Sequence, residues 1–149
     1  MRLPTSLALA AGLALGLVVA AAGAADRDAG RAAAQTIENS SHSTTGYIRS
    51  DGTIENSSHS TVGYIRGDGT IENSSHSTIG YVRGGTVENS SHSTVGYVRD
   101  DGTVENSSHS TIGYVRKDGT VENSSHSTIG HAAGVRADWV AVVFFFIKF

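Results

Sequence analysis

A unit of 17 residues recurs six times between Thr36 and Gly130, and residues 53–69 give its full form, TIENSSHSTVGYIRGDG. Such a repeat constrains the fold strongly, because each unit is one supersecondary element that must pack against its neighbours. Each unit holds two runs rich in β-branched and aromatic residues, such as 53–56 and 61–66, separated by Asn/Ser and Asp-Gly clusters. These are strand and turn signals. The sequence therefore predicts an all-β chain of tandem hairpins.

The link between units indicates how the strands pair. Four links have three residues ending in Asp-Gly, whereas one is reduced to Gly84-Gly85. A three-residue loop with a final glycine suits a type I turn with a bulge, and Gly-Gly suits a type I′ turn. Both keep one register, in which Tyr47 faces Glu55 and, in the short copy, Tyr81 faces Glu88. This favours antiparallel hairpins in a meander, a ring or a flower-like assembly over the alternative, a β-solenoid with stacked coils.

Alternation along the strands gives the hairpin two faces. Ile54, Asn56, Thr61, Gly63 and Ile65 share the face that is predicted to be the core. The opposite face is amphipathic and carries the residues between them, with Arg66 and Glu55 able to pair across strands. An isolated hairpin is marginal in water, so the hairpins must stabilise one another.

The regions outside the repeats predict compartment and domain limits. Residues 1–24 combine Arg2, an uncharged apolar run and a small-residue site, which is typical of a secretory signal peptide, with a retained membrane anchor as the alternative. Residues 25–35 form a polar lead-in, flexible or weakly helical, 36–130 the repeat domain and 131–149 an apolar aromatic tail. We therefore expect an exported protein, in the periplasm, the outer membrane or outside the cell.

Composition narrows the classes of function. The chain has no cysteine and a net charge of −3, and its basic residues are spread along the repeats. A nucleic-acid-binding protein needs a basic stripe, so that class is set aside. Ser58-His59 does not predict catalysis either, because adjacent residues in a strand or turn point apart and a catalytic triad depends on convergence. We expect no enzyme activity and no cofactor.

The segment Asn-Ser-Ser-His-Ser-Thr is identical in all six copies. Imidazole binds zinc or nickel and titrates near neutrality, so a metal or pH-sensing site is one hypothesis. It requires two or three imidazoles to converge on one ion. The alternative is recent duplication, with Ser and His satisfying a polar turn. The candidate metal ligands are His42, His59, His76, His92, His109 and His126.

A second binding hypothesis rests on one threonine per repeat. A flat exposed row of these side chains would suit a periodic ligand such as ice or a glycan. The row would consist of Thr44, Thr61, Thr78, Thr94, Thr111 and Thr128.

The tail holds nine successive apolar residues, Trp139 to Ile147, and ends in Phe149. Its length is close to that of a membrane β-strand. The alternating Val143, Phe145 and Ile147 resemble the C-terminal recognition strand of bacterial outer-membrane barrel proteins. The repeats lack the outward apolar band of such barrels. The tail therefore predicts contact with an outer membrane or, alternatively, a final strand that fills the core or a segment that drives self-association.

The leader, the T-[IV]-E-N-S-S-H-S-T-[IV]-G-Y-[IV]-R repeats and the Phe-rich end together resemble exported bacterial hairpin-repeat proteins with "beta-flower" domains. The resemblance covers residues 36–149 and implies a fold without implying an activity or binding residues. Taken with the composition, it predicts a non-enzymatic structural or adhesive protein of the bacterial envelope. The alternatives are a metal-, glycan- or ice-binding module and an outer-membrane-associated protein.

Overall fold

The computed structural model describes residues 33–149, so the predicted signal peptide and most of the lead-in lie outside the described residues. This part of the chain forms twelve strands, a short α-helix and a π-helical turn. The first strands of the six hairpins are β1 (Ala34–Asn39), β3 (Thr53–Asn56), β5 (Thr70–Asn73), β7 (Thr86–Asn89), β9 (Thr103–Asn106) and β11 (Thr120–Asn123). The second strands are β2 (Thr44–Arg49), β4 (Thr61–Ile65), β6 (Thr78–Arg83), β8 (Thr94–Val98), β10 (Thr111–Val115) and β12 (Thr128–His131).

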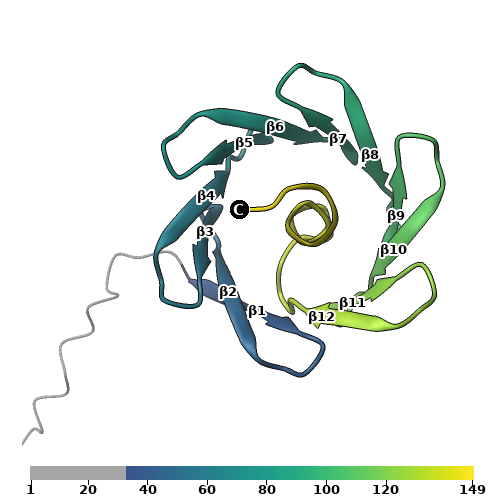
Figure 1. The fold of residues 1–149 in the computed structure, drawn as a ribbon, viewed down its shortest axis with the longest axis horizontal. Coiled ribbons are helices and arrows are strands. Elements are labelled where there is room, and N and C mark those ends of the chain that lie inside the picture. Colours follow the sequence, from purple (N-terminus) through teal and green to yellow (C-terminus); the bar gives the residue numbers. More distant parts are fainter. Residues whose placement is uncertain (1–32) are drawn as a thin grey trace, which may run out of the picture. The chain divides into compact units, whose positions relative to one another are not determined.

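The strands form one closed antiparallel barrel in which each strand pairs with its neighbours in the chain and β1 pairs with β12. Figure 1 shows the hairpin loops projecting outward around this ring and the helical tail inside it. The hairpin prediction is confirmed, and the β-solenoid alternative is wrong. Because β1 begins at Ala34, the last two residues of the predicted lead-in are strand.

The turns between units have the predicted register. Tyr47 faces Glu55 across a three-residue turn, and Tyr81 faces Glu88 across Gly84-Gly85. Gly52 closes its turn at φ 87°, whereas both glycines of the short turn have positive φ. Only a residue without a Cβ adopts this backbone readily. The deleted residue therefore changes the turn type and leaves the strand pairing intact.

Each hairpin carries a bulge near its outer loop. Ile54 faces Gly63 and Glu55 faces Thr61, so Val62 is the extra residue on β4. Val62 and its Val or Ile equivalents in four other hairpins pack against the core instead of lying on the outer face with the tyrosines. Simple alternation did not predict this, because a bulge shifts the side-chain pattern of one strand.

The core lies inside the barrel and is built from one aliphatic residue on each of the strands β1 to β11 and from Ala132, directly after β12. Ile54 and Ile65 are 2% and 0% exposed, as the predicted core face requires. Their equivalents in the other hairpins are also buried, although the last position of the sixth copy holds Ala132. Burying this apolar surface contributes about 25 cal/mol per Å². The hairpins are therefore stabilised by a shared core.

The tail fills the barrel as a helix. Helix α1 (Ala137–Ala141) is followed by the π-helical turn η1 (Val142–Phe146), in which the amide of Ile147 donates to the carbonyl of Val142 at 2.9 Å. Val140 and Val142 are completely buried. The strand predicted for this segment is wrong, while its place in the core matches one of the alternatives left open. Within the described part of the chain, no helix is long and apolar enough to cross a membrane.

In five of the six hairpins, the glycine of the second strand packs against one side chain of the tail. A Cβ on Gly113 would collide with the ring of Phe145 and with the carbonyl of Glu122, so the glycine leaves the space that the ring occupies. Four other hairpins repeat this arrangement, each with a different tail residue. The pairs are Phe144 with Gly130, Phe145 with Gly113, Phe146 with Gly96, Ile147 with Gly80 and Phe149 with Gly63.

Candidate functional site

The six outer loops have one conformation. In the second copy Asn56 caps the loop, because its Oδ1 accepts hydrogen bonds from the amides of Ser58 and Ser60, both at 3.0 Å. The amide of His59 donates to the carbonyl of Asn56, and His59 has φ 60°. The six loop histidines all lie at φ between 58° and 62°. Asn-Ser-Ser-His-Ser thus builds a rigid turn whose asparagine and histidine have defined structural roles.

The loop histidines join neighbouring hairpins. The ring of His76 stacks on Tyr64 of the preceding copy, with centroids 4.6 Å apart and planes inclined by 17°. Stacked aromatic pairs are favourable beyond their burial. Four more junctions repeat the stack, and at the sixth His131 replaces the tyrosine. The other pairs are Tyr47 with His59, Tyr81 with His92, Tyr97 with His109, Tyr114 with His126 and His131 with His42.

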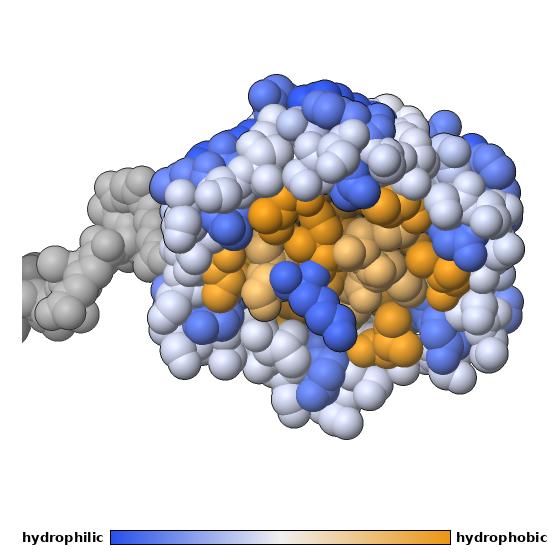
Figure 2. Space-filling view, turned by 45° about the horizontal axis from the view of Figure 1, so that its top comes forward, coloured by the Kyte–Doolittle hydropathy of each residue, from blue (hydrophilic) through white to orange (hydrophobic). Residues whose placement is uncertain are grey.

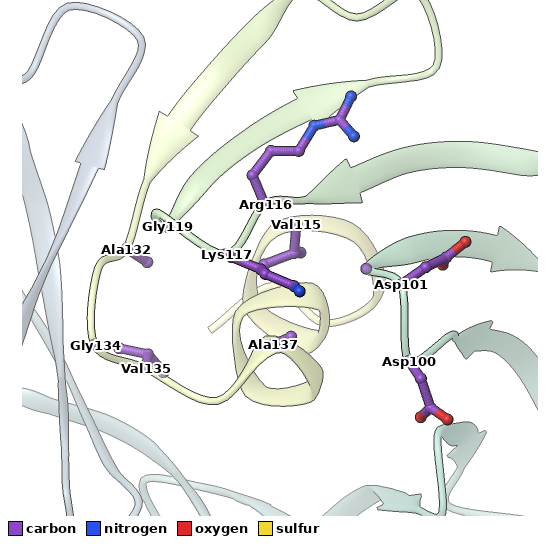
Figure 3. Close-up of a pocket in the computed structure, with 11 residues that line it drawn as sticks. Asp100, Asp101, Val115, Arg116, Lys117, Gly119, Ala132, Gly134, Val135 and Ala137 are labelled. Atoms are coloured by element: carbon purple, nitrogen blue, oxygen red, sulfur yellow. The ribbon is translucent and has the colours of Figure 1, made fainter.

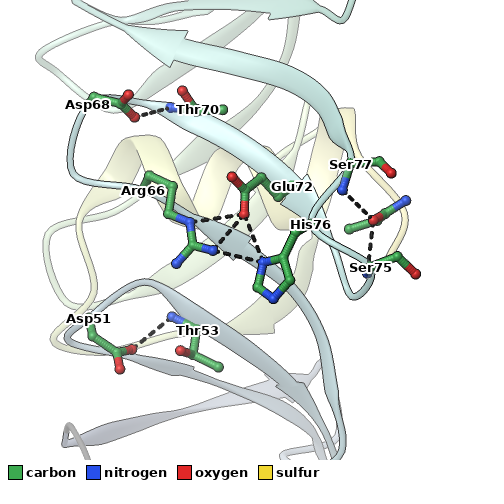
Figure 4. A network of polar contacts seen from close by, with 10 residues as sticks. Asp51, Thr53, Arg66, Asp68, Thr70, Glu72, Ser75, His76 and Ser77 are labelled. Carbon is green, nitrogen blue, oxygen red and sulfur yellow. Dashed lines mark hydrogen bonds and ion pairs between the residues drawn. The ribbon is translucent and has the colours of Figure 1, made fainter.

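At three of the junctions an arginine and a glutamate complete the outer surface, and Figure 4 shows one of them. The Nη2 of Arg66 donates to Glu72 at 2.6 Å and lies 3.0 Å from the Nδ1 of His76. That Nδ1 is also 3.2 Å from Glu72. Neutral His76 with its proton on Nε2 accepts from Arg66, whereas protonated His76 donates to Glu72. Arg66 thus pairs with Glu72 of the following strand, instead of the predicted Glu55.

The same network recurs with local variation. Arg99 bonds to Glu105, and Arg116 bonds to Glu122, each beside its histidine. In the short-turn copy Arg83 donates to the carbonyl of Asp68 and keeps its guanidinium over a tyrosine ring. Three of the six junctions between described hairpins therefore carry the same exposed polar network.

The networks shift the ionisation of their acids. The hydrogen bond from Arg66, followed by that of His76, lowers the pKa of Glu72. The equivalent arginines and histidines lower the pKa of Glu105 and of Glu122. In the inter-repeat turns, the amide of Thr70 donates to Asp68 and lowers its pKa, and the same bond recurs at Asp101 and Asp118. These carboxylates are stabilised in their charged form.

The candidate ligands from the sequence do not converge. The six loop histidines lie on six different hairpins, and residues 33–149 contain no group of three or more His, Cys, Asp or Glu that could hold a metal ion. The metal hypothesis therefore lacks the geometry that it requires. The six threonines open the second strands and so lie around a closed ring, not in the flat row that ice binding needs.

A small polar pocket lies at the end of the barrel opposite the loops (Figure 3). It has a volume of about 120 Å³ and is lined by Asp101, Lys117, Val115 and Val135 among others. Figure 3 shows it beside α1, where the chain enters the barrel. Its size suits a few water molecules at most.

Two positions that depart from the repeat were not singled out in the sequence, although both have specific contacts in the structure. Thr45 stands where the other copies have Val or Ile, and it lies beside an apolar cavity described below. His131 stands where they have tyrosine, and it closes the ring on His42. Aligning the six copies with one another would have marked both positions.

The comparisons with known proteins agree with this architecture. The model of a family described as "5-fold beta-flower protein" matches residues 34–148. Neither the curated proteins nor the solved structures gave a match. The family's description gives five-fold symmetry, whereas the described residues of this chain form six hairpins. The match spans most of the chain and coincides with the closed hairpin ring and its tail, so this chain belongs to the 5-fold beta-flower protein family.

Proposed function

We propose that this chain is an exported, non-enzymatic structural protein that adheres to a repetitive surface of the bacterial envelope through its six outer loops. The observation that carries the proposal is that six loops of identical sequence share one rigid conformation. Their serine and histidine side chains are exposed at the rim of the ring. Membership of a structural repeat family agrees with a role without catalysis.

Six identical contacts favour a partner that is itself repetitive. Once one loop is bound, the others bind at a high effective concentration, so weak single contacts add up to firm attachment. Pre-formed loops lose little conformational entropy on binding. A polysaccharide such as peptidoglycan offers repeated hydroxyl and amide groups that Ser and His can hydrogen-bond.

Sedimentation with purified peptidoglycan tests this proposal. Ser57→Ala with Ser58→Ala removes two exposed hydroxyls from one loop while the capping Asn56 and the backbone bonds remain. We expect the bound fraction to fall steeply when three and then six loops are changed, because avidity depends on the number of contacts. Equal sedimentation of the wild type and the six-loop variant would contradict the proposal.

A matched control changes exposed residues at the opposite turns. Ser50→Ala, Asp100→Asn and Lys117→Gln affect exposed side chains far along the hairpins from the loops. We expect these changes to leave sedimentation unaltered. Export is tested separately: the full chain expressed in a Gram-negative bacterium should leave the cytoplasm and begin at Ala25 or Asp26 by mass spectrometry. An uncleaved cytoplasmic chain would contradict it.

A further inference from the structure

The first hairpin (β1–β2) lacks the tail residue that packs against the glycine of the other five hairpins. The heavy atoms closest to a Cβ on Gly46 are backbone atoms of Glu55 and Asn56, whereas at the other five glycines of this row a tail side chain is among the closest atoms. A cavity of about 360 Å³ lies here. Its lining comprises Ile37, Thr45, Gly46, Ile54, Glu55, Asn56, Val62, Val143, Ile147, Lys148 and Phe149.

The tail residue nearest to this position is too small to fill it. Val143 precedes Phe144, which packs on Gly130 of the adjacent hairpin, and Val143 itself lines the cavity beside Gly46. Four of the five occupied niches hold a phenyl ring and the fifth holds isoleucine. The occupied niches therefore indicate that the unfilled niche of the first hairpin fits one aromatic ring.

The same hairpin departs from the repeat at the residue that lines the cavity. Thr45 replaces the Val or Ile found at this bulge in the other five copies. Its hydroxyl donates to the carbonyl of Ile37 at 3.2 Å. A hydroxyl has one proton and two lone pairs, so the oxygen of Thr45 can still accept a hydrogen bond. The cavity therefore combines apolar walls with one polar group that favours a donor.

The cavity is accessible from solvent. Val62, Val143 and Ile147 are partly buried although they pack against the core. Figure 2 shows hydrophobic surface in a hollow that is rimmed by hydrophilic residues. A volume of 360 Å³ falls in the range of small-molecule pockets. A ligand of ring size can enter without unfolding the barrel.

We propose that this niche beside Gly46 and Thr45 binds a small aromatic molecule whose ring carries a hydrogen-bond donor, of which phenol is the simplest. The ring takes the place that a phenylalanine of the tail has in four other niches. Its hydroxyl donates to the oxygen of Thr45. Apolar cavities of smaller volume are known to bind benzene, so burial of the ring alone contributes favourably to the free energy of binding.

Titration of the full chain with phenol and with toluene, followed by calorimetry, tests the proposal. We expect one saturable site for phenol and weaker binding of toluene. Thr45→Val gives this niche the residue type found at the other five. It should weaken phenol binding by about three- to tenfold, the effect of one hydrogen bond, without weakening toluene binding. Thr44→Val is the matched control, since Thr44 is exposed and does not line the cavity; it should change neither affinity.

Val143→Phe supplies the missing ring from the tail itself. We expect it to abolish binding of both probes while the barrel still unfolds cooperatively. Should this variant fail to fold, NOEs between phenol protons and the methyl groups of Ile54 and Val62 in the wild-type chain locate the ligand directly. The proposal is overturned if no saturable binding occurs, if folded Val143→Phe binds as the wild type does, or if the NOEs arise from other residues.

Discussion

The imidazole of His131 stacks on that of His42, with ring centroids 4.1 Å apart and planes inclined by 14°. This contact joins the last strand to the first, where the other five junctions pair a tyrosine with a histidine. The paired residues between β1 and β12 are Glu38 with His131 and Asn39 with Gly130, whereas β1 and β2 share five pairs. Closure of the ring therefore depends on a short ladder and one stacked pair.

His131→Tyr should stabilise the closed ring. The substitution restores the Tyr–His stack of the other junctions, and a larger ring buries more surface, so we expect a gain of up to about 1 kcal/mol. Urea denaturation measures the difference. His131→Ala is the control and should destabilise the protein. If the tyrosine variant proves as unstable as the alanine variant, the junction between β12 and β1 does not tolerate the Tyr–His stack of the other five junctions.

The Tyr97–His109 stack should contribute measurable coupling between hairpins. Tyr97→Leu and His109→Asn remove the two rings, and asparagine tolerates the positive φ of the loop. We expect a double-mutant cycle to give about 0.5–1.5 kcal/mol of interaction energy. Additive single effects would show that the rings adjoin without stabilising each other.

Acid should weaken the barrel through the arginine–glutamate networks. The pKa of Glu72, Glu105 and Glu122 lies below its usual value in the folded state, because each accepts hydrogen bonds from an arginine. Their contribution to the free energy of unfolding is fully present above the unfolded pKa of 4.5 and is lost as pH falls through the lower folded value.

Denaturation curves between pH 7 and pH 2.5 check this dependence. The triple variant Glu72→Gln, Glu105→Gln, Glu122→Gln should be less stable than the wild type at pH 7 and should lose less stability on acidification. Asp68, Asp101 and Asp118 retain a depressed pKa, so part of the slope should remain. If the free energy of unfolding falls with pH equally in the two proteins, groups other than these three glutamates cause the acid sensitivity.

Two glycines of different repeats should respond differently to alanine. Gly113→Ala places a methyl group against the ring of Phe145 and a backbone carbonyl, so we expect a loss of about 2 kcal/mol or more. Gly67→Ala meets no atom within 4 Å and restricts the unfolded chain, so it should be neutral or stabilising by about 0.4–1 kcal/mol. Thermal denaturation of both variants compares them. Similar losses of stability in the two variants would argue against close packing between the tail and the glycines of the second strands.

Removal of residues 139–149 should prevent folding. Val140, Ala141 and Val142 are completely buried in the barrel, so their loss leaves an unfilled core. Circular dichroism and size-exclusion chromatography of the truncated chain should show an unfolded or aggregated protein. A folded monomer with an intact near-UV spectrum would show that the hairpins close without the tail.

Much of the fold could be predicted because the repeat carries its own register. Gly84-Gly85 revealed the hairpin turn, and the alternation of Ile54 and Ile65 revealed the core face. The helical state of residues 139–146 could not be predicted, since an apolar run with β-branched and aromatic residues has the local propensity of a strand. What decides its state is the space enclosed by the ring, and that depends on all six hairpins at once.

The candidate sites were harder to predict for the same reason. A histidine in a polar turn shows neither the tyrosine on which it stacks nor the arginine beside it, because both come from a neighbouring copy. Thr45 is likewise an ordinary strand residue in the sequence. Its place beside a cavity that the tail does not fill depends on the closed barrel, so it could not be predicted.

The helical turn inside the ring has a further consequence. A single helical segment has no rotational symmetry, so it breaks the equivalence of hairpins that are nearly identical in sequence. The glycine of the second strand faces a phenyl ring in four hairpins, an isoleucine in one and no tail side chain in the first. Selection therefore acts differently on equivalent positions of the six copies. The same substitution is expected to change stability by different amounts in different copies.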